Sequence, residues 1–241
     1  RRHTPAEARV AIVDVTGAEA VLAVMGPAAR DLLQPLTAAD LSAAAFPFGD
    51  AQEIEIGYVP VRAQRTSYVG ELGFELYAPS EMAHGVFDRL RAAGADHGLR
   101  LAGYHVFDSC RIEKGFRHFG HDIGPDDTPL EAGLGFAVKF DKPASKFGPF
   151  IGREVLARQR DAGPLTKRLV QFRLNDPAPL LYHLEPILHD GEIVGYLTSG
   201  GYGHHLGGAV GLGYVNCPQG VDQDWLAGGH WQIEVALTAV D

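Results

Sequence analysis

The sequence predicts an α+β protein in which an antiparallel sheet with packed helices is followed by a small C-terminal β-barrel domain. Three observations lead to this prediction. Segments rich in Val, Ile, Tyr and Phe are interspersed with helical patterns in the first part of the chain. Short strand-like segments separated by Gly, Pro and Asp fill the last part. With 241 residues, 46% of them hydrophobic, the chain is long enough to bury more than one small core.

The first predicted elements are two strands and a short helix. Apolar residues alternate imperfectly with small or polar ones over residues 9–16 and again over residues 19–25, on either side of Gly17. Pro27 stands at a favourable first helical position, and leucines at helical spacing follow it. We therefore expect strands at 9–16 and 19–25 and a helix at 28–36.

The next segments predict a meander followed by a helix. Residues 53–56, 59–66 and 73–77 are rich in β-branched and aromatic side chains, which favours three antiparallel strands. Ser80 is a candidate N-cap for a helix that ends near residues 94–98, because apolar residues recur on one face of that segment.

A second helix is predicted at residues 104–114, with Gly115 as its stop signal. Strands and helices in this order are typical of a ferredoxin-like α+β unit. The segment DAGPL, residues 161–165, is the best linker candidate, because short strand-like segments separated by Gly, Pro and Asp begin after it. The strands expected beyond it, in a small barrel or sandwich, are 168–174, 185–189, 192–199, 209–215 and 231–240.

Composition excludes several kinds of partner. Lys and Arg total 21 against 30 for Asp and Glu, and the net charge of -9 argues against a nucleic acid recognised through its phosphates. No apolar run approaches the ~20 residues that a membrane helix needs, so no membrane partner is expected. Cys110 and Cys217 lie far apart without CxxC spacing, which argues against a disulfide framework and indicates a reducing compartment.

Familiar catalytic and metal motifs are missing from the sequence. It contains no GxGxxG, which argues against a nicotinamide or flavin site within this chain. It contains no GxSxG, and Cys110 falls in an apolar helical pattern where a small buried side chain is expected. His118 and His121 lack the spacing and the nearby carboxylate of a HExxH site, so no metal is expected.

The sharpest local feature is SYVGELGFELY, residues 67–77. Glycines at 70 and 73 flank a turn that displays Glu71 between two strand-like pieces. An ionised carboxylate accepts two parallel N–H bonds, which suits the 2-amino and N3–H edge of a pterin. Tyr68 adds a ring or a hydroxyl to the same pocket. The alternative, left open by spacing alone, is an exposed turn with a solvated Glu71.

A second feature is YHVFDSCRIEKGFRHFGH, residues 104–121. Asp108 and Arg111 lie three residues apart on one helical face. Arg111 has apolar neighbours, so its guanidinium is expected to be buried or to face a pocket. A ligand contact and a structural ion pair with Asp108 are both compatible with this pattern.

Five motifs, in order and spacing, resemble the glycine-cleavage T-protein (aminomethyltransferase) family, from about residue 15 to the C-terminus. The resemblance is closest to the folate module at the end of dimethylglycine and sarcosine dehydrogenases. It implies a three-domain cloverleaf arrangement, with residues 1–46 as a remnant of the first subdomain, 47–160 as the ferredoxin-like folate-binding subdomain with a return to the first, and 165–241 as the barrel. The motifs are SYVGELGFELY, DSCRIEKGFRHFGHDI, PLEAGLGFAVKFDK, FIGREVL and TSGGYGHHLGGAVGLGYV.

The resemblance also implies roles for particular residues. Glu71 matches the family glutamate that binds the pterin of tetrahydrofolate, and Tyr68 matches the aromatic residue three positions before it. Arg111 matches the arginine of the family's SLRLEKG-like helix, where this chain reads SCRIEKG with Cys110 in place of Leu. The family aspartate that assists one-carbon transfer belongs to a segment upstream of this chain, and so does the expected FAD domain. We therefore expect an incomplete chain that binds folate and receives a one-carbon unit from a donor formed by the upstream domain.

Two other functions remain as alternatives under the same resemblance. One is a stand-alone aminomethyltransferase of the glycine cleavage type. The other is a non-enzymatic folate-binding protein that assists iron–sulfur protein maturation, although residues 114–121 read KGFRHFGH and lack the cysteine of that group's KGCYxGQE motif. The expected location is the cytoplasm of a bacterium or the mitochondrial matrix of a eukaryote.

Overall fold

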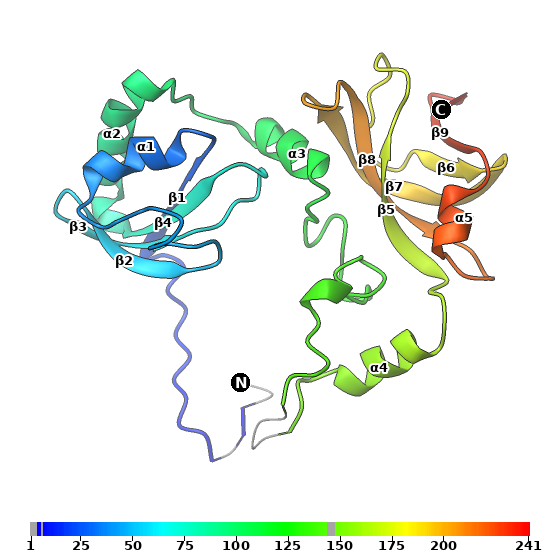
Figure 1. Ribbon diagram of the computed structural model, residues 1–241, viewed down its shortest axis with the longest axis horizontal. Coiled ribbons are helices and arrows are strands. Elements are labelled where there is room, and N and C mark those ends of the chain that lie inside the picture. Colours follow the sequence, from blue (N-terminus) through cyan, green and yellow to red (C-terminus); the bar gives the residue numbers. More distant parts are fainter. Residues whose placement is uncertain (1–3, 6, 144–147) are drawn as a thin grey trace. The chain divides into compact units, whose positions relative to one another are not determined.

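The computed structural model describes residues 4, 5, 7–143 and 148–241, and the chain divides into two compact units. The first unit is Arg1–Phe107 and the second is Asp108–Asp241. The division falls within helix α3 (Tyr104–Glu113). Figure 1 labels the elements of both units.

The first unit contains a four-stranded antiparallel sheet in the order β1-β4-β3-β2. Buried and exposed residues alternate along β2 and β3, as the sequence predicts for strands with one face on a core. Strand β1 pairs with β4 along its full length, from Glu19 opposite Pro79 to Met25 opposite Gly73. The strands are β1 (Glu19–Met25), β2 (Ala51–Ile56), β3 (Val59–Gln64) and β4 (Gly73–Pro79).

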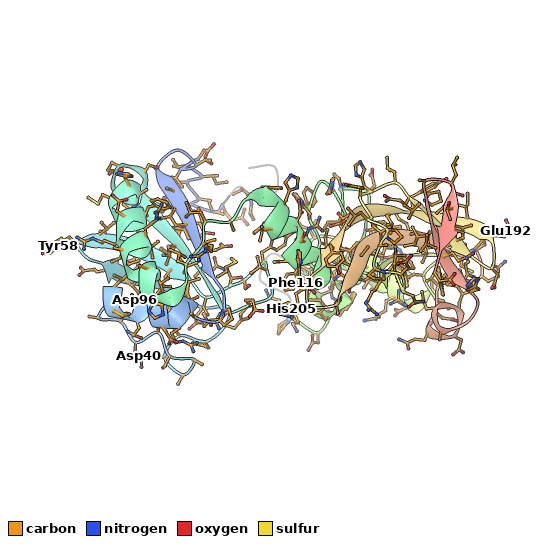
Figure 2. All side chains as sticks on the ribbon, turned by 90° about the horizontal axis from the view of Figure 1, so that it is seen from above. Asp40, Tyr58, Asp96, Phe116, Glu192 and His205 are labelled. Atoms are coloured by element: carbon orange, nitrogen blue, oxygen red, sulfur yellow. The ribbon has the colours of Figure 1, made fainter. Side chains whose placement is uncertain are left out.

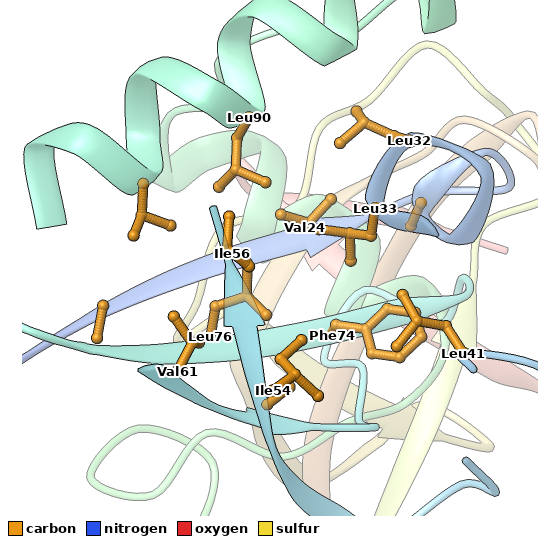
Figure 3. Close-up of a cluster of buried hydrophobic side chains, with 14 of the residues drawn as sticks. Val24, Leu32, Leu33, Leu41, Ile54, Ile56, Val61, Phe74, Leu76 and Leu90 are labelled. Atoms are coloured by element: carbon orange, nitrogen blue, oxygen red, sulfur yellow. The ribbon is translucent and has the colours of Figure 1, made fainter. Parts of the chain in front are cut away.

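Helices α1 (Ala29–Leu33) and α2 (Ala83–Ala93) pack on this sheet. Helix α1 tightens into a 3-10 turn at Gln34–Leu36, because a proline at the second position of that turn lacks the N–H that would continue the α-helix. Figure 3 shows leucines of both helices facing the apolar side chains of the strands. The buried core comprises Val24, Ala29, Leu32, Leu33, Leu41, Phe46, Ile54, Ile56, Val61, Ala63, Phe74, Leu76, Ala78, Val86 and Leu90.

Two local predictions in this unit are wrong. Residues 9–16 form no strand: Thr16 donates hydrogen bonds from its N–H and its hydroxyl to the Asp14 carboxylate, which closes a local turn in place of strand pairing. Ser80 is not the N-cap of α2, because its hydroxyl donates to the Gly17 carbonyl oxygen, 3.0 Å away. Short 3-10 turns, Ser80–Met82 and Gly94–His97, flank that helix.

The second unit contains a six-stranded antiparallel sheet in the order β10-β9-β6-β7-β8-β5. The predicted α+β class, with an antiparallel sheet and helices followed by a C-terminal barrel-type domain, is confirmed. The strands are β5 (Lys167–Arg173), β6 (Pro186–His189), β7 (Glu192–Gly203), β8 (Gly208–Asn216), β9 (Trp231–Val235) and β10 (Thr238–Val240). The other elements are α4 (Arg153–Asp161), α5 (Gln223–Ala227) and a 3-10 turn at Gly135–Ala137.

The compact units differ from the predicted boundaries at 46/47 and 160/165. Across the first predicted boundary, β1 pairs with the sheet of β2–β4 and α1 packs in the same core. Ahead of the second, Ile112 of α3 packs in a buried cluster with Leu169, Val210 and Leu212 of the barrel-type sheet. Burial of apolar surface therefore joins α3 and the segment after it to the C-terminal strands. Both boundaries stay predictions.

The turns of each sheet lie at the surface of its own unit. Figure 2 shows Tyr58 at the β2–β3 turn and Glu192 at the start of β7, both at the surface. Tyr58 is 91% exposed. Within the described residues, no helix combines the length and the apolarity that crossing a membrane requires.

Candidate functional site

The 65–72 loop, which joins β3 to β4, carries Tyr68 and Glu71. It is fixed on both sides of Glu71. Gly70 has a φ of 78°, a left-handed conformation that glycine adopts without strain, and its N–H donates to the Ser67 hydroxyl at 3.1 Å. The Leu72 carbonyl oxygen accepts the Gly26 N–H at 2.8 Å. Both neighbours of Glu71 are thus held by hydrogen bonds.

The Glu71 side chain is partly buried. Among the described residues, none donates a hydrogen bond to its carboxylate. A partly desolvated carboxylate that retains its acceptor capacity is suited to a ligand with two adjacent N–H donors. The solvated-turn alternative is less favoured, because the side chain is not fully exposed and its backbone is fixed.

Tyr68 lies against the first turn of α3. Its ring centroid is 4.7 Å from that of Phe107, and Phe107 lies 6.0 Å from the ring of Tyr104. Such tilted ring contacts fix the plane of each ring. Tyr68, Phe107 and Tyr104 form a row of rings. Tyr104 is 66% exposed, so this row ends in an accessible aromatic face. The loop that carries Glu71 therefore contacts the rings at the start of α3 through Tyr68.

Arg111 lies in the second unit, in the last turn of α3, and its side chain is only 1% exposed. Its Nε donates to the Asp108 carboxylate at 3.0 Å, and its Nη2 donates to the Ser199 hydroxyl at 2.8 Å. Its Nη1 donates to the Phe116 carbonyl oxygen at 3.2 Å and to the Asp122 carboxylate. The ion pair with Asp108 that the sequence left open is therefore present.

Asp122 is the counter-charge of this network and is completely buried. Besides Arg111, its carboxylate accepts the His118 backbone N–H at 2.8 Å. It also accepts the hydroxyls of Thr198 at 2.7 Å and Ser199 at 2.5 Å. A buried charge pair is tolerated only when its remaining donors and acceptors are satisfied, as they are here. The network therefore fastens α3 and the segment after it to β7.

The three predicted site residues belong to two different units. Tyr68 and Glu71 share one loop of the first unit, whereas the Arg111 donors are taken by protein groups of the second unit. The role of Arg111 as a folate contact stays a prediction. Sequence reasoning passed over Asp122 and Ser199, although both lie within the quoted motifs, because their partnership spans 77 residues.

The histidines do not form a metal site in the part of the chain described. The ring centroids of His118 and His121 are 5.6 Å apart, and His183 lies 6.1 Å from His121. Over residues 4, 5, 7–143 and 148–241, no group of three or more His, Cys, Asp or Glu is arranged to hold a metal ion.

Two domains of one protein family match the chain. The GCVT N-terminal domain matches residues 1–142, and the glycine cleavage T-protein C-terminal barrel domain matches residues 167–241. The chain belongs to the glycine cleavage T-protein family. The predicted linker at 161–165 falls between the two matched segments.

Similar proteins include an oxidase and a dehydrogenase. The chain is 46% identical over 202 residues to 4-methylaminobutanoate oxidase (formaldehyde-forming) of Paenarthrobacter nicotinovorans, an alignment that covers 84% of this chain and 24% of that protein. It is 41% identical over 225 residues to mitochondrial sarcosine dehydrogenase of Homo sapiens, covering 92% of this chain and 24% of that protein. The chain thus spans about a quarter of the length of these relatives.

A solved structure has the same fold. It is the glycine cleavage system aminomethyltransferase T from Bartonella henselae, with a TM-score of 0.74 and 26% identity. The match covers 92% of this chain and 57% of that one.

Proposed function

We propose that this chain is the tetrahydrofolate-binding, one-carbon-transfer module of a flavin-linked N-methyl amine dehydrogenase of the dimethylglycine or sarcosine type, which forms methylenetetrahydrofolate. The observation that carries the proposal is Glu71, a partly buried carboxylate on a fixed loop, with no hydrogen-bond donor to it among the described residues. In this proposal the flavin is bound by an upstream domain of the longer protein.

The residues of the 65–72 loop fit the pterin of tetrahydrofolate. The two Glu71 oxygens accept the 2-amino and N3–H donors in parallel, which fixes the orientation of the ring. The row of Tyr68, Phe107 and Tyr104 offers aromatic faces for the flat parts of the ligand. Arg111 stabilises the α3 segment through its buried network.

In the proposed function, the protein contributes by positioning tetrahydrofolate. Tetrahydrofolate supplies the nucleophilic nitrogen that captures an iminium or formaldehyde equivalent. Glu71 holds the ring in one orientation, and the ring row limits its tilt, which reduces the entropy cost of the encounter with the donor. The family aspartate expected upstream assists transfer at the folate nitrogen in the longer protein.

The dehydrogenase proposal is supported by the identities of 46% to a 4-methylaminobutanoate oxidase and 41% to a sarcosine dehydrogenase. The second candidate is a stand-alone aminomethyltransferase of the glycine cleavage type, which is supported by the structural match over 92% of the chain. The reading frame upstream of Arg1 distinguishes the two. A GxGxxG-bearing flavin domain is expected there, and a frame that encodes only the rest of the T-protein fold contradicts the first candidate.

Folate recognition itself is tested by calorimetric titration of the chain with tetrahydrofolate under anaerobic conditions. Glu71→Ala is expected to weaken binding by about 1 to 3 kcal/mol, because two charge-assisted hydrogen bonds are lost. Glu81→Ala is the control, since Glu81 is an exposed carboxylate on the same unit. Equal affinities of the two variants would mean that the pterin binds elsewhere, and no binding by the unsubstituted chain or by the full-length protein would refute the folate reading.

A further inference from the structure

Arg65 joins the two ends of the 65–72 loop. Its N–H donates to the Asp50 carbonyl oxygen and its own carbonyl oxygen accepts the Gly49 N–H, each at 2.8 Å. Its side chain reaches across the loop, where Nη1 donates to the Gly73 carbonyl oxygen at 3.1 Å. Arg65, the first residue of the loop, is therefore hydrogen-bonded to Gly73, the residue that immediately follows the loop.

The neck of the loop is also closed by backbone packing. A Cβ on Gly73 would lie 2.6 Å from the Thr66 carbonyl oxygen and 3.0 Å from the Met25 side chain. No side chain fits between these atoms, because real Cβ contacts are longer. The Ser67 hydroxyl lies 4.0 Å from the Met25 sulfur and accepts the Gly70 N–H. The loop thus starts and ends at one narrow point of the sheet.

The Arg65 guanidinium is held without a carboxylate partner among the described residues. It lies 5.2 Å from the ring centroid of Phe74, a fully buried core residue. Its Nε is buried and has no hydrogen-bond partner in the described part of the chain. Burial lowers the pKa of Arg65, and the positive charge of Arg30 acts in the same direction. Ion pairing therefore does not explain this arginine, and the bond to Gly73 is its clearest contribution.

We propose that Arg65 is a positioning residue that fastens the 65–72 loop and thereby holds Glu71 in the orientation that receives a pterin. The ligand part of this inference rests on the proposed folate function. Glu71 lies between Gly70 and Leu72, which are bonded to Ser67 and Gly26. The Arg65 bond fixes the end of the same short segment, so its loss releases the backbone that aims the Glu71 carboxylate.

Three variants of the whole chain test the inference. Arg65→Met removes every guanidinium donor and keeps the length of the side chain. Arg65→Lys keeps a charge and a donor, and it is the variant to use if Arg65→Met does not fold. Arg62→Met is the matched control, because Arg62 also lies over a β4 ring, that of Tyr77 at 4.7 Å, but bonds to Glu19 away from the loop.

Amide hydrogen exchange of peptides covering 65–73 is measured without ligand, and tetrahydrofolate affinity is measured by calorimetry. Arg65→Met is expected to speed exchange in the loop and to raise the Kd about tenfold, the effect of one lost hydrogen bond from a charged donor. Arg65→Lys is expected to recover part of both effects, and Arg62→Met is expected to change neither.

Unchanged exchange in Arg65→Met would overturn the inference. Faster exchange with an unchanged Kd would also overturn it, because the arginine would then be merely structural. Failure of the folate function has a different signature: the unsubstituted chain gives no heat with tetrahydrofolate, while the exchange data still decide whether Arg65 orders the loop.

Discussion

The substitution Asp122→Asn tests the buried network that joins α3 to β7. The amide has the shape of the carboxylate, but it replaces one acceptor oxygen by an NH2 donor. Every partner of Asp122 is a donor: Arg111 and the His118 N–H face Oδ2, and the hydroxyls of Thr198 and Ser199 face Oδ1. On the Oδ2 side the new NH2 group faces two N–H donors, and on the Oδ1 side it faces two hydroxyls that can turn to accept, but the charge that balances Arg111 is lost in either orientation.

The expected cost follows from these contacts. The substitution leaves the Arg111 charge buried, and among the described residues its remaining carboxylate partner is Asp108, whose side chain is 32% exposed. Removal of one partner of a buried ion pair costs about 3 to 5 kcal/mol. With the NH2 group on the Oδ2 side, two N–H donors would lose their acceptor, which gives a similar sum at about 1 to 3 kcal/mol for each donor. The melting temperature is then expected to fall by about 6 to 20 °C, at about 2 to 4 °C per kcal/mol for domains of this size class.

Urea unfolding is monitored by tryptophan fluorescence. This signal reports on the second unit, because the two tryptophans of the chain, Trp225 and Trp231, both belong to it. Asp108→Asn is the control. Asp108 is partly exposed, and its loss leaves Asp122 in place, so a cost of about 1 kcal/mol or less is expected. If Asp122→Asn and Asp108→Asn have the same urea midpoint and the same dependence of unfolding free energy on urea concentration, the reasoning from burial is wrong.

Two further predictions concern the second unit. Gly200→Ala is expected to destabilise it by about 1 to 3 kcal/mol or more, because the new Cβ would lie 2.3 Å from a backbone atom of Leu181, whereas Gly201→Ala, with its nearest contact at 3.6 Å, is expected to be nearly neutral in the same urea assay. Equal effects would contradict the close approach. For Asp127, desolvation raises the pKa, but the Lys167 bond at 2.6 Å and other hydrogen bonds outweigh it and lower the net pKa. A lowered folded-state pKa contributes stability that is present above the unfolded value and is lost as the pH falls through the folded value. Unfolding free energies measured from pH 7 to pH 3 should therefore decline less steeply at the acid end in Asp127→Asn than in the unsubstituted chain, and parallel curves would refute this assignment.

Much of the candidate loop was predictable because its signals are local. Glycines at 70 and 73 and the alternating pattern after them predict a turn followed by a strand, and the structure has a loop to residue 72 and β4 from Gly73. The stop signal at Gly115 is likewise confirmed, since α3 ends at Glu113 and Gly115 has a φ of 65°. The Arg65 side-chain bond to Gly73 lay outside this reasoning, because the pattern does not say which side chain closes a loop.

Sequence patterns also failed where the partner of a segment is distant. Apolar and polar residues alternate over 9–16 as in a strand, but this pattern does not provide a neighbouring strand to pair with. The Asp14–Thr16 turn competes with strand pairing, because it satisfies hydrogen-bonding groups locally. Ser80 has the chemistry of an N-cap, but a carbonyl oxygen 63 residues away in sequence accepts its hydroxyl. In both cases the residue type is compatible with two structures, and the tertiary surroundings select one.

The sequence by itself determined the antiparallel sheets, helices α1, α2 and α3, and a turn at Glu71, because periodicity, glycine and turn chemistry act over a few residues. Only the tertiary structure decided that Arg111 pairs with Asp122 and Ser199, and that β1 joins the sheet of β2–β4. These contacts depend on burial of charge and on strand pairing across long stretches of chain, which no local pattern encodes.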